Sequence, residues 1–88
     1  MAIEKKRPTQ EELRALGVFT WPIWSCQPSS FDWSYSETET CYFLEGRVRI
    51  ESPDGVVEAG AGDLLVFPEG LSCTWNVIEK VRKHYRFD

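Results

Sequence analysis

Apolar and polar residues alternate with a period of two along most of this chain, from Val18 to the C-terminus. This period is typical of β-strands that bury one face and expose the other. Turns rich in glycine and proline separate the alternating segments. The strands are expected at residues 18–26, 31–35, 39–44, 47–51, 56–58, 64–67, 71–78 and 81–87. Strands this short and evenly spaced favour an all-β barrel or jelly roll over a sheet packed against helices.

One helical pattern precedes the strands. Thr9 can cap the first amide groups of a helix, and Glu12, three residues later, can complete a capping box. Gly17 can supply the left-handed residue that ends a helix. We therefore expect an N-terminal arm with a short helical turn at residues 1–17, beginning as a polar lead-in, and one domain at residues 18–88.

The chain has 88 residues and a net charge of −4. A domain this small buries only roughly 60–65% of the surface of its unfolded chain, so we expect its many aromatic residues to supply much of the core. The negative charge argues against a nucleic-acid partner, because phosphate binding requires clustered Lys and Arg. The one dense basic run, Arg82-Lys83 with Arg86, is interpreted as the polar face of the last strand.

Nothing in the sequence indicates a membrane or an oxidising compartment. No apolar run approaches the roughly 18–20 residues needed to span a bilayer, and the charged N-terminal segment lacks the apolar core of a secretory signal. The three cysteines are odd in number and lack paired spacing, which indicates reduced thiols. We expect no membrane partner and a cytoplasmic location.

The most specific spacing in the chain lies in two segments that contain turn glycines. In Phe31–Gly46, Glu39 precedes the closing glycine by seven positions, and in Gly62–Cys73 a Pro-x-Gly turn precedes the cysteine. This pair resembles the two motifs of the cupin superfamily. With Trp21–Trp24 and Arg82–Tyr85 added, the chain resembles the small single-domain cupins related to ureidoglycine aminohydrolase. The resemblance implies an all-β cupin double-stranded β-helix, a jelly-roll barrel of two antiparallel sheets with a short N-terminal helical turn, and a homodimer.

The resemblance also locates the metal site of other cupins. There, three histidines and a glutamate hold the metal, and the matching positions here are Trp33, Tyr35, Cys73 and Glu39. With one histidine in the chain, a histidine-ligated metal cannot be held within one subunit. We predict no cofactor. A divalent metal, if bound, would require Glu39 and Cys73 with Cys41 or Tyr35, and such mixed oxygen and sulfur ligands suit zinc or iron.

Alternation predicts which side chains share the inner face of the barrel, because residues two apart in a strand point the same way. The predicted pocket consists of Trp33, Tyr35, Glu39, Cys41, Phe43, Cys73 and Trp75. The aromatic residues can equally be core packing, and the two thiols can be small buried hydrophobes. Glu39 either pairs with an arginine or a tyrosine hydroxyl, or it is poised as an acid or base.

Two functions are consistent with this pocket. The first is a small cupin that binds a small polar metabolite in the barrel, without the usual histidine-ligated metal. The alternative is a minimal enzyme, with or without a metal, that acts on an amide- or ureide-type metabolite through the catalytic candidates Glu39 and Cys73.

We expect a homodimer, because Trp21, Ile23, Tyr42 and Leu44 would form an outward apolar sheet face that a two-fold interface could cover. His84 alternates with arginines and is expected on the surface or in an interface.

Overall fold

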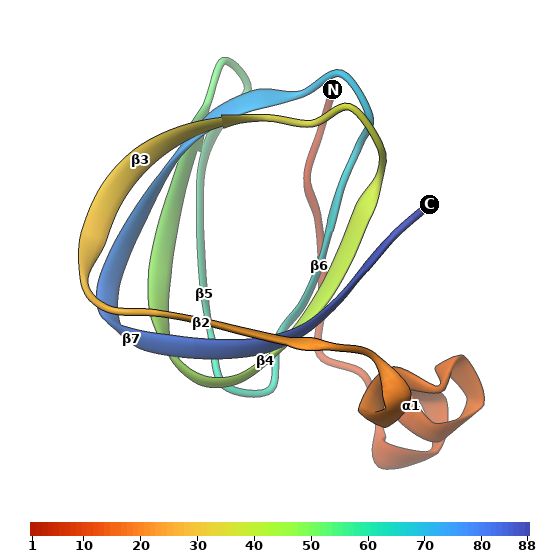
Figure 1. The fold of residues 1–88 in the computed structure, drawn as a ribbon. Helices are drawn as coiled ribbons and strands as arrows, with labels where there is room; N and C mark the ends of the chain where they lie inside the picture. The colour runs from red at the N-terminus through yellow and green to blue at the C-terminus, as the bar shows by residue number, and fades with distance from the viewer.

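A computed structural model describes all 88 residues as a barrel of antiparallel strands with a short helix at one corner (Figure 1). The elements, in chain order, are β1 (Glu4–Lys6), α1 (Gln10–Leu16), the 3-10 turn η1 (Val18–Thr20), β2 (Ile23–Cys26), β3 (Ser29–Ser34), β4 (Glu39–Ser52), β5 (Gly55–Gly60), β6 (Leu64–Phe67) and β7 (Ser72–Phe87). This confirms the all-β jelly-roll barrel and the short helical turn expected from the sequence.

Two long strands, β4 and β7, pair with each other along nearly their whole lengths and belong to both halves of the barrel. In one half the order is β1-β6-β4-β7-β2, and in the other β5 and β3 flank the same pair. The two antiparallel sheets that we expected are the two halves of one continuous seven-stranded sheet, which curves round on itself (Figure 1). The two halves face each other across the core.

Strands β4 and β7 both bend near their middles, at the positions where the sequence predicted breaks between shorter strands. The β4–β7 register shifts between Phe43 and Val48, which marks β-bulges, so each expected pair of short strands is a single bent strand. Gly46 stands at this bend with φ of 97°, and a Cβ there would lie 2.3 Å from the Lys80 carbonyl oxygen. A glycine is therefore required at the closest approach of the two backbones.

The N-terminal segment is built as the sequence predicted, with additions. The Glu12 amide donates to the Thr9 hydroxyl at 3.2 Å and the Thr9 amide donates to Glu12 at 3.0 Å, which forms the predicted capping box. Gly17 ends the helix at φ of 73°. The supposed polar lead-in contains β1, which pairs with β6, and residues 18–20 form η1 where we expected strand. No helix in the structure is long and apolar enough to cross a membrane.

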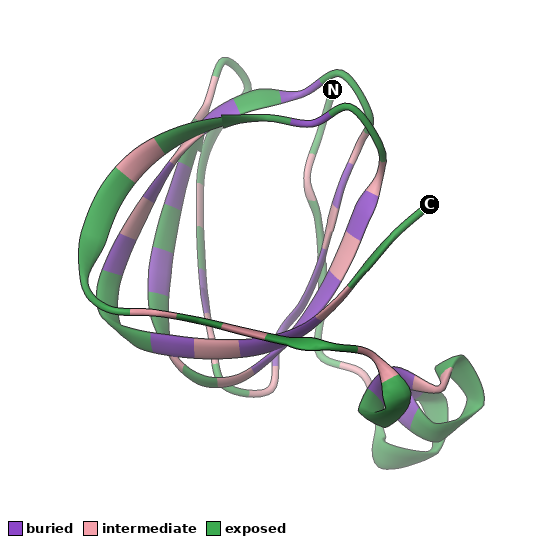
Figure 2. Ribbon diagram, viewed as in Figure 1, coloured by how far each residue is buried: buried purple, intermediate pink, exposed green.

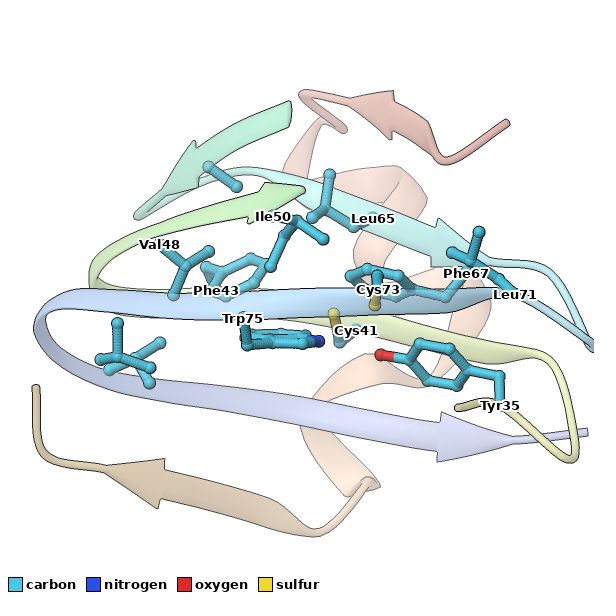
Figure 3. Close-up of a cluster of buried hydrophobic side chains, with 13 residues drawn as sticks. Tyr35, Cys41, Phe43, Val48, Ile50, Leu65, Phe67, Leu71, Cys73 and Trp75 are labelled. Carbon is cyan, nitrogen blue, oxygen red and sulfur yellow. The ribbon is translucent and has the colours of Figure 1, made fainter. Parts of the chain in front are cut away.

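The main core lies inside the barrel, between its two halves (Figures 2 and 3). It consists of Tyr35, Cys41, Phe43, Val48, Ile50, Ala59, Leu65, Phe67, Leu71, Cys73, Trp75, Val77 and Val81. Along β4 and β7 these residues alternate with outward-facing ones, most of which are less buried, as the period of two predicted.

A smaller cluster on the outside of the barrel corrects our argument for a dimer. Leu13 of α1 and Val18 of η1 pack with Tyr42 and Leu64, and the cluster also buries parts of Trp21 and Leu44. Of the expected outward face, Ile23 alone is largely exposed. The chain's own helix covers the surface that we had assigned to a partner.

We predict that Gly46→Ala lowers the free energy of unfolding by about 2–5 kcal/mol, because the new methyl group meets backbone atoms of β7 at a positive φ. Gly55→Ala is the matched control: Gly55 also has a positive φ, but nothing lies within 4 Å of a Cβ there. Its cost should be limited to about 1–2 kcal/mol of backbone strain. Urea unfolding of the two variants measures the difference, and equal losses would contradict our account of the bend.

Candidate functional site

A cavity of about 190 Å³ opens between strands β2 and β3 on one side and strands β4 and β7 on the other. Its walls are almost entirely aromatic. They consist of Trp24, Phe31, Trp33, Tyr35, Glu39, Trp75, Lys83, Tyr85 and Phe87. Only two of these nine residues, Glu39 and Lys83, carry a charge. The cavity therefore combines an apolar lining with one localised polar group.

Strand alternation brings the lining residues to one place. In β7, Trp75 and Lys83 lie on the same inner face as the core residues Val77 and Val81 between them. Cross-strand pairing then sets Phe31 of β3 directly opposite Trp75. Each wall of the cavity is thus a face of a regular strand.

The polar group is a buried chain of three side chains. Lys83 Nζ donates to Glu39 Oε2 at 2.6 Å, and Tyr35 Oη donates to Glu39 Oε1 at 2.7 Å. Glu39 and Lys83 are only 3% and 5% exposed. Figure 3 shows the Tyr35 hydroxyl turned into the barrel, toward Trp75 and Cys41. Both carboxylate oxygens are therefore occupied by donors from this chain.

Aromatic rings complete the surroundings of the lysine. The Lys83 ammonium lies 4.5 Å from the ring centre of Trp75 and 5.0 Å from that of Trp24. Such cation–π contacts compensate in part for the water that the ammonium loses. Glu39 is the one hydrogen-bond acceptor that the structure gives to this ammonium, so two of its three N–H groups have no oxygen partner.

Burial keeps the neighbouring groups neutral. Desolvation, with the charge of Glu39 adding to it, raises the pKa of Tyr35 far above its ordinary value of 10.0. Desolvation likewise raises the pKa of the Cys41 thiol from 9.0 to about 12, although the Lys83 charge opposes the shift. At neutral pH, Tyr35 is a hydrogen-bond donor to Glu39, and Cys41 is an uncharged thiol.

The structure brings four of the seven predicted pocket residues to the cavity wall: Trp33, Tyr35, Glu39 and Trp75. The other three must be corrected. Cys41 and Phe43 face inward as predicted, but they are fully buried in the core, because the small barrel is filled by side chains at that level. Cys73 lies beside a separate, more polar groove together with Asp32, Ser34 and Glu51 among others, and burial raises the pKa of its thiol.

Sequence reasoning missed five lining residues: Trp24, Phe31, Lys83, Tyr85 and Phe87. The interpretation of the basic run as a solvated face was wrong for its middle residue, since Lys83 is buried. The inner-face pattern assigned to residues 73–77 continues through residues 81–87. Extending it would have predicted the lysine, the tyrosine and the phenylalanine of this strand.

Two further expectations on polar residues have clear outcomes. The partner of Glu39 includes a tyrosine hydroxyl, as one alternative stated, but its cation is a lysine and not an arginine. His84 was expected on the surface or in an interface, and the chain's own N-terminal segment buries it: its Nδ1 lies 2.8 Å from the Trp21 carbonyl oxygen, and Phe19 packs edge-on against its ring. The N-terminal segment that covers the outer face accounts for this burial.

The residues at the cupin metal position do not fit a metal ion. No group of three or more His, Cys, Asp or Glu side chains is clustered in a way that could hold one. The glutamate that would serve as a ligand is already paired with the Lys83 ammonium at 2.6 Å. A cation supplied by the chain therefore stands where a metal would need the carboxylate.

We predict that Glu39→Gln lowers the free energy of unfolding by about 3 kcal/mol, because it leaves the Lys83 ammonium buried without a counter-charge. Lys83→Met should lower the free energy of unfolding by about as much, because it leaves the Glu39 carboxylate buried without a cation. The double variant Glu39→Gln/Lys83→Met should cost much less than the sum, since both charges are then removed. Thermal and urea unfolding of all three variants tests this; additive losses would show that the pair is not coupled.

The same burial predicts instability at alkaline pH. Folded Cys41 and Tyr35 keep their protons where the unfolded chain loses them, so ionisation favours the unfolded state. The stability contributed by the neutral thiol should be complete below about pH 9 and be lost progressively between pH 9 and about pH 12. Urea unfolding from pH 7 to 11 should show this decline, and it should be shallower in Cys41→Ala. An equally steep decline in that variant would contradict the assignment.

Comparisons with known proteins agree with this architecture. The family model described as an EutQ-like cupin domain matches residues 13–85. A DUF861 family protein from Thermotoga maritima is 46% identical, with a TM-score of 0.95 over 99% of this chain and 100% of that one. The EutQ protein of Clostridium difficile is 25% identical, with a TM-score of 0.69. That match covers 74% of this chain but 52% of the EutQ chain, so this protein spans about half of that relative.

No match was found among curated proteins. A DUF861 family protein of unknown function from Pseudomonas syringae is 25% identical, with a TM-score of 0.68, and covers 75% of this chain and 29% of its own. The expected small cupin is thus confirmed, and the closer link to ureidoglycine aminohydrolase stays a prediction. Since the family match takes in most of the chain and the fold agrees with it, this protein belongs to the EutQ-like cupin family.

Proposed function

We propose that this cupin binds a small polar molecule in the aromatic cavity, through Lys83, Glu39 and Tyr35, without a histidine-ligated metal. One observation carries the proposal: a buried ion pair lies in the wall of an open cavity. Ligand pockets typically combine aromatic walls with a few convergent polar groups that fix the orientation of the ligand. The cavity matches that description in its lining.

The energetics of the ion pair support a binding role. A buried ion pair contributes little to stability, since desolvation of both charges offsets most of their attraction. Lys83 also keeps two N–H groups without an oxygen partner, so the site can donate to a ligand. Trp33 and Phe87, at the cavity wall, remain 49% and 41% exposed. A ligand seated there would cover apolar surface and use the free donors together.

The alternative is a minimal enzyme that uses Glu39 and Cys73 on an amide- or ureide-type metabolite, as the resemblance to ureidoglycine aminohydrolase would imply. The chemistry of the thiol argues against it. A cysteine nucleophile acts as the thiolate, and burial together with the charge of Glu39 raises the pKa of Cys73. Cys73 also lines the other groove. Binding is therefore the function that the geometry supports better.

The cellular setting is part of the proposal. All three cysteines, Cys26, Cys41 and Cys73, are free thiols, which suits the reducing cytoplasm. A homodimer stays a prediction. Outside the cavity, the large apolar side chains left exposed for a partner to cover are Met1, Leu16, Phe19, Ile23, Val56 and Ile78. We propose no nucleic-acid or membrane partner.

The experiment is a fragment screen followed by ¹H–¹⁵N NMR mapping. We expect hits that shift the amides of β2, β3 and β7 around the cavity. Trp33→Ala should weaken them by about tenfold or more, because a stacking wall is lost. Trp21→Ala is the matched control, since Trp21 packs against Arg86 on the outer face. A screen with no hits in the cavity, or equal affinity in the two variants, would overturn the proposed function.

A further inference from the structure

We infer that the cavity selects a neutral, planar ring compound that carries a carbonyl oxygen, such as an aryl amide or a lactam. The inference rests on the proposed function and specifies the ligand of that same cavity. Charge balance, free hydrogen-bonding groups and the shape of the walls each point to this class.

The charges in the wall cancel. Glu39 and Lys83 are the only charged residues that line the cavity, and they are paired with each other at 2.6 Å. An anion would be attracted by the Lys83 ammonium and repelled by the adjacent Glu39 carboxylate. A cation would be attracted by the carboxylate and repelled by the ammonium. Inside a cavity of low polarity, either net charge would lack full compensation. A neutral ligand avoids this cost.

The free hydrogen-bonding groups call for an acceptor on the ligand. Lys83 has two N–H groups without an oxygen partner, and a carbonyl oxygen can accept from them. The Tyr35 oxygen, which already donates to Glu39, and the remaining carboxylate lone pairs can accept an N–H group. Donors and acceptors lie side by side in the wall, which matches the adjacent C=O and N–H of an amide.

The walls favour a flat ring of limited size. Phe31 and Trp75 lie nearly parallel, with 7° between their planes, and Trp24 meets Trp75 edge to face. Flat apolar walls of this kind suit a ring that stacks or packs edge-on. At about 190 Å³ the cavity is smaller than the roughly 300–1,000 Å³ of pockets for drug-sized ligands, so a single ring is the appropriate scale.

Three probes of the same shape test the inference: benzamide, benzoate and benzamidine, which are neutral, anionic and cationic. Their dissociation constants are measured by NMR titration, with tryptophan fluorescence as a second readout, since Trp24, Trp33 and Trp75 line the cavity. We expect benzamide to bind at least about tenfold more tightly than either charged probe, the equivalent of one uncompensated interaction.

Variants that remove one charge of the ion pair should change which of the three probes binds most tightly. Glu39→Gln keeps the size of the side chain and leaves Lys83 as the single charge, so benzoate should become the tightest of the three. Lys83→Met leaves Glu39 alone, so benzamidine should lead. Glu45→Gln is the matched control: Glu45 pairs with Arg82 on the exposed face of the same two strands, and its loss should leave the benzamide preference unchanged. If either charge-changing variant fails to fold, the order of the three probes on the unmodified protein still decides the outcome.

Each result has a defined meaning. A wild-type preference for benzoate or benzamidine, or an order that Glu39→Gln does not change, would overturn the inference. If none of the three probes binds, the inference is also wrong. In that case the proposed function is judged by the fragment screen alone, because hits of other chemistry in the cavity would still support it.

Discussion

The pairing of β4 with β7 is the constraint on which the molecule depends. These two strands cross both halves of the barrel, and every other strand of the barrel except β1 pairs directly with one of them. Their shared bend turns one sheet into two facing halves, and it requires the close approach that only Gly46 permits. Because β4 and β7 are paired, Glu39 of β4 and Lys83 of β7 both point into the barrel and come close enough to form the ion pair. The pairing that builds the fold therefore also builds the ion pair.

The ion pair in turn organises the cavity. A buried carboxylate needs compensation, and here it receives a lysine ammonium and a tyrosine hydroxyl. The ammonium is itself flanked by Trp24 and Trp75, which explains why the walls around a charged pair can be almost wholly aromatic. This arrangement differs in kind from a metal site, because both charges belong to the chain.

The sequence predicted the fold well because its signals are local. Alternation along the strands and the capping box at Thr9 and Glu12 can each be recognised within a few positions, and both agree with the structure. The glycine spacing placed Glu39 correctly inside the barrel. The predicted breaks within β4 and β7 were wrong. At Gly46 of β4 the sequence suits a turn or a bulge equally, and the long-range pairing with β7 decides between them.

The site was harder to predict, since it depends on which strands meet across the barrel. Trp24 and Phe31 line the cavity because β2 and β3 both lie along β7, which no local pattern reveals. Lys83 stands among charged neighbours in sequence, so its burial shows only when the alternation of β7 is followed to the end of the strand. Cys41 and Phe43 were assigned to the correct face, but they lie in the packed core and not at the cavity wall. Alternation gives the direction of a side chain and not whether the space in front of it is filled.

The short strand β1 has a consequence for how copies of this protein behave toward one another. It closes the outer edge of β6 with three exposed charged residues, Glu4-Lys5-Lys6, and it is held there by ion pairs from Met1 to Asp54 and from Arg7 to Asp63. An open strand edge invites another sheet to add to it, whereas a short edge strand bearing lysines discourages such growth. The first seven residues are therefore expected to oppose edge-to-edge aggregation. A chain without them would expose the unpaired edge of the apolar strand Leu64–Phe67 to other copies.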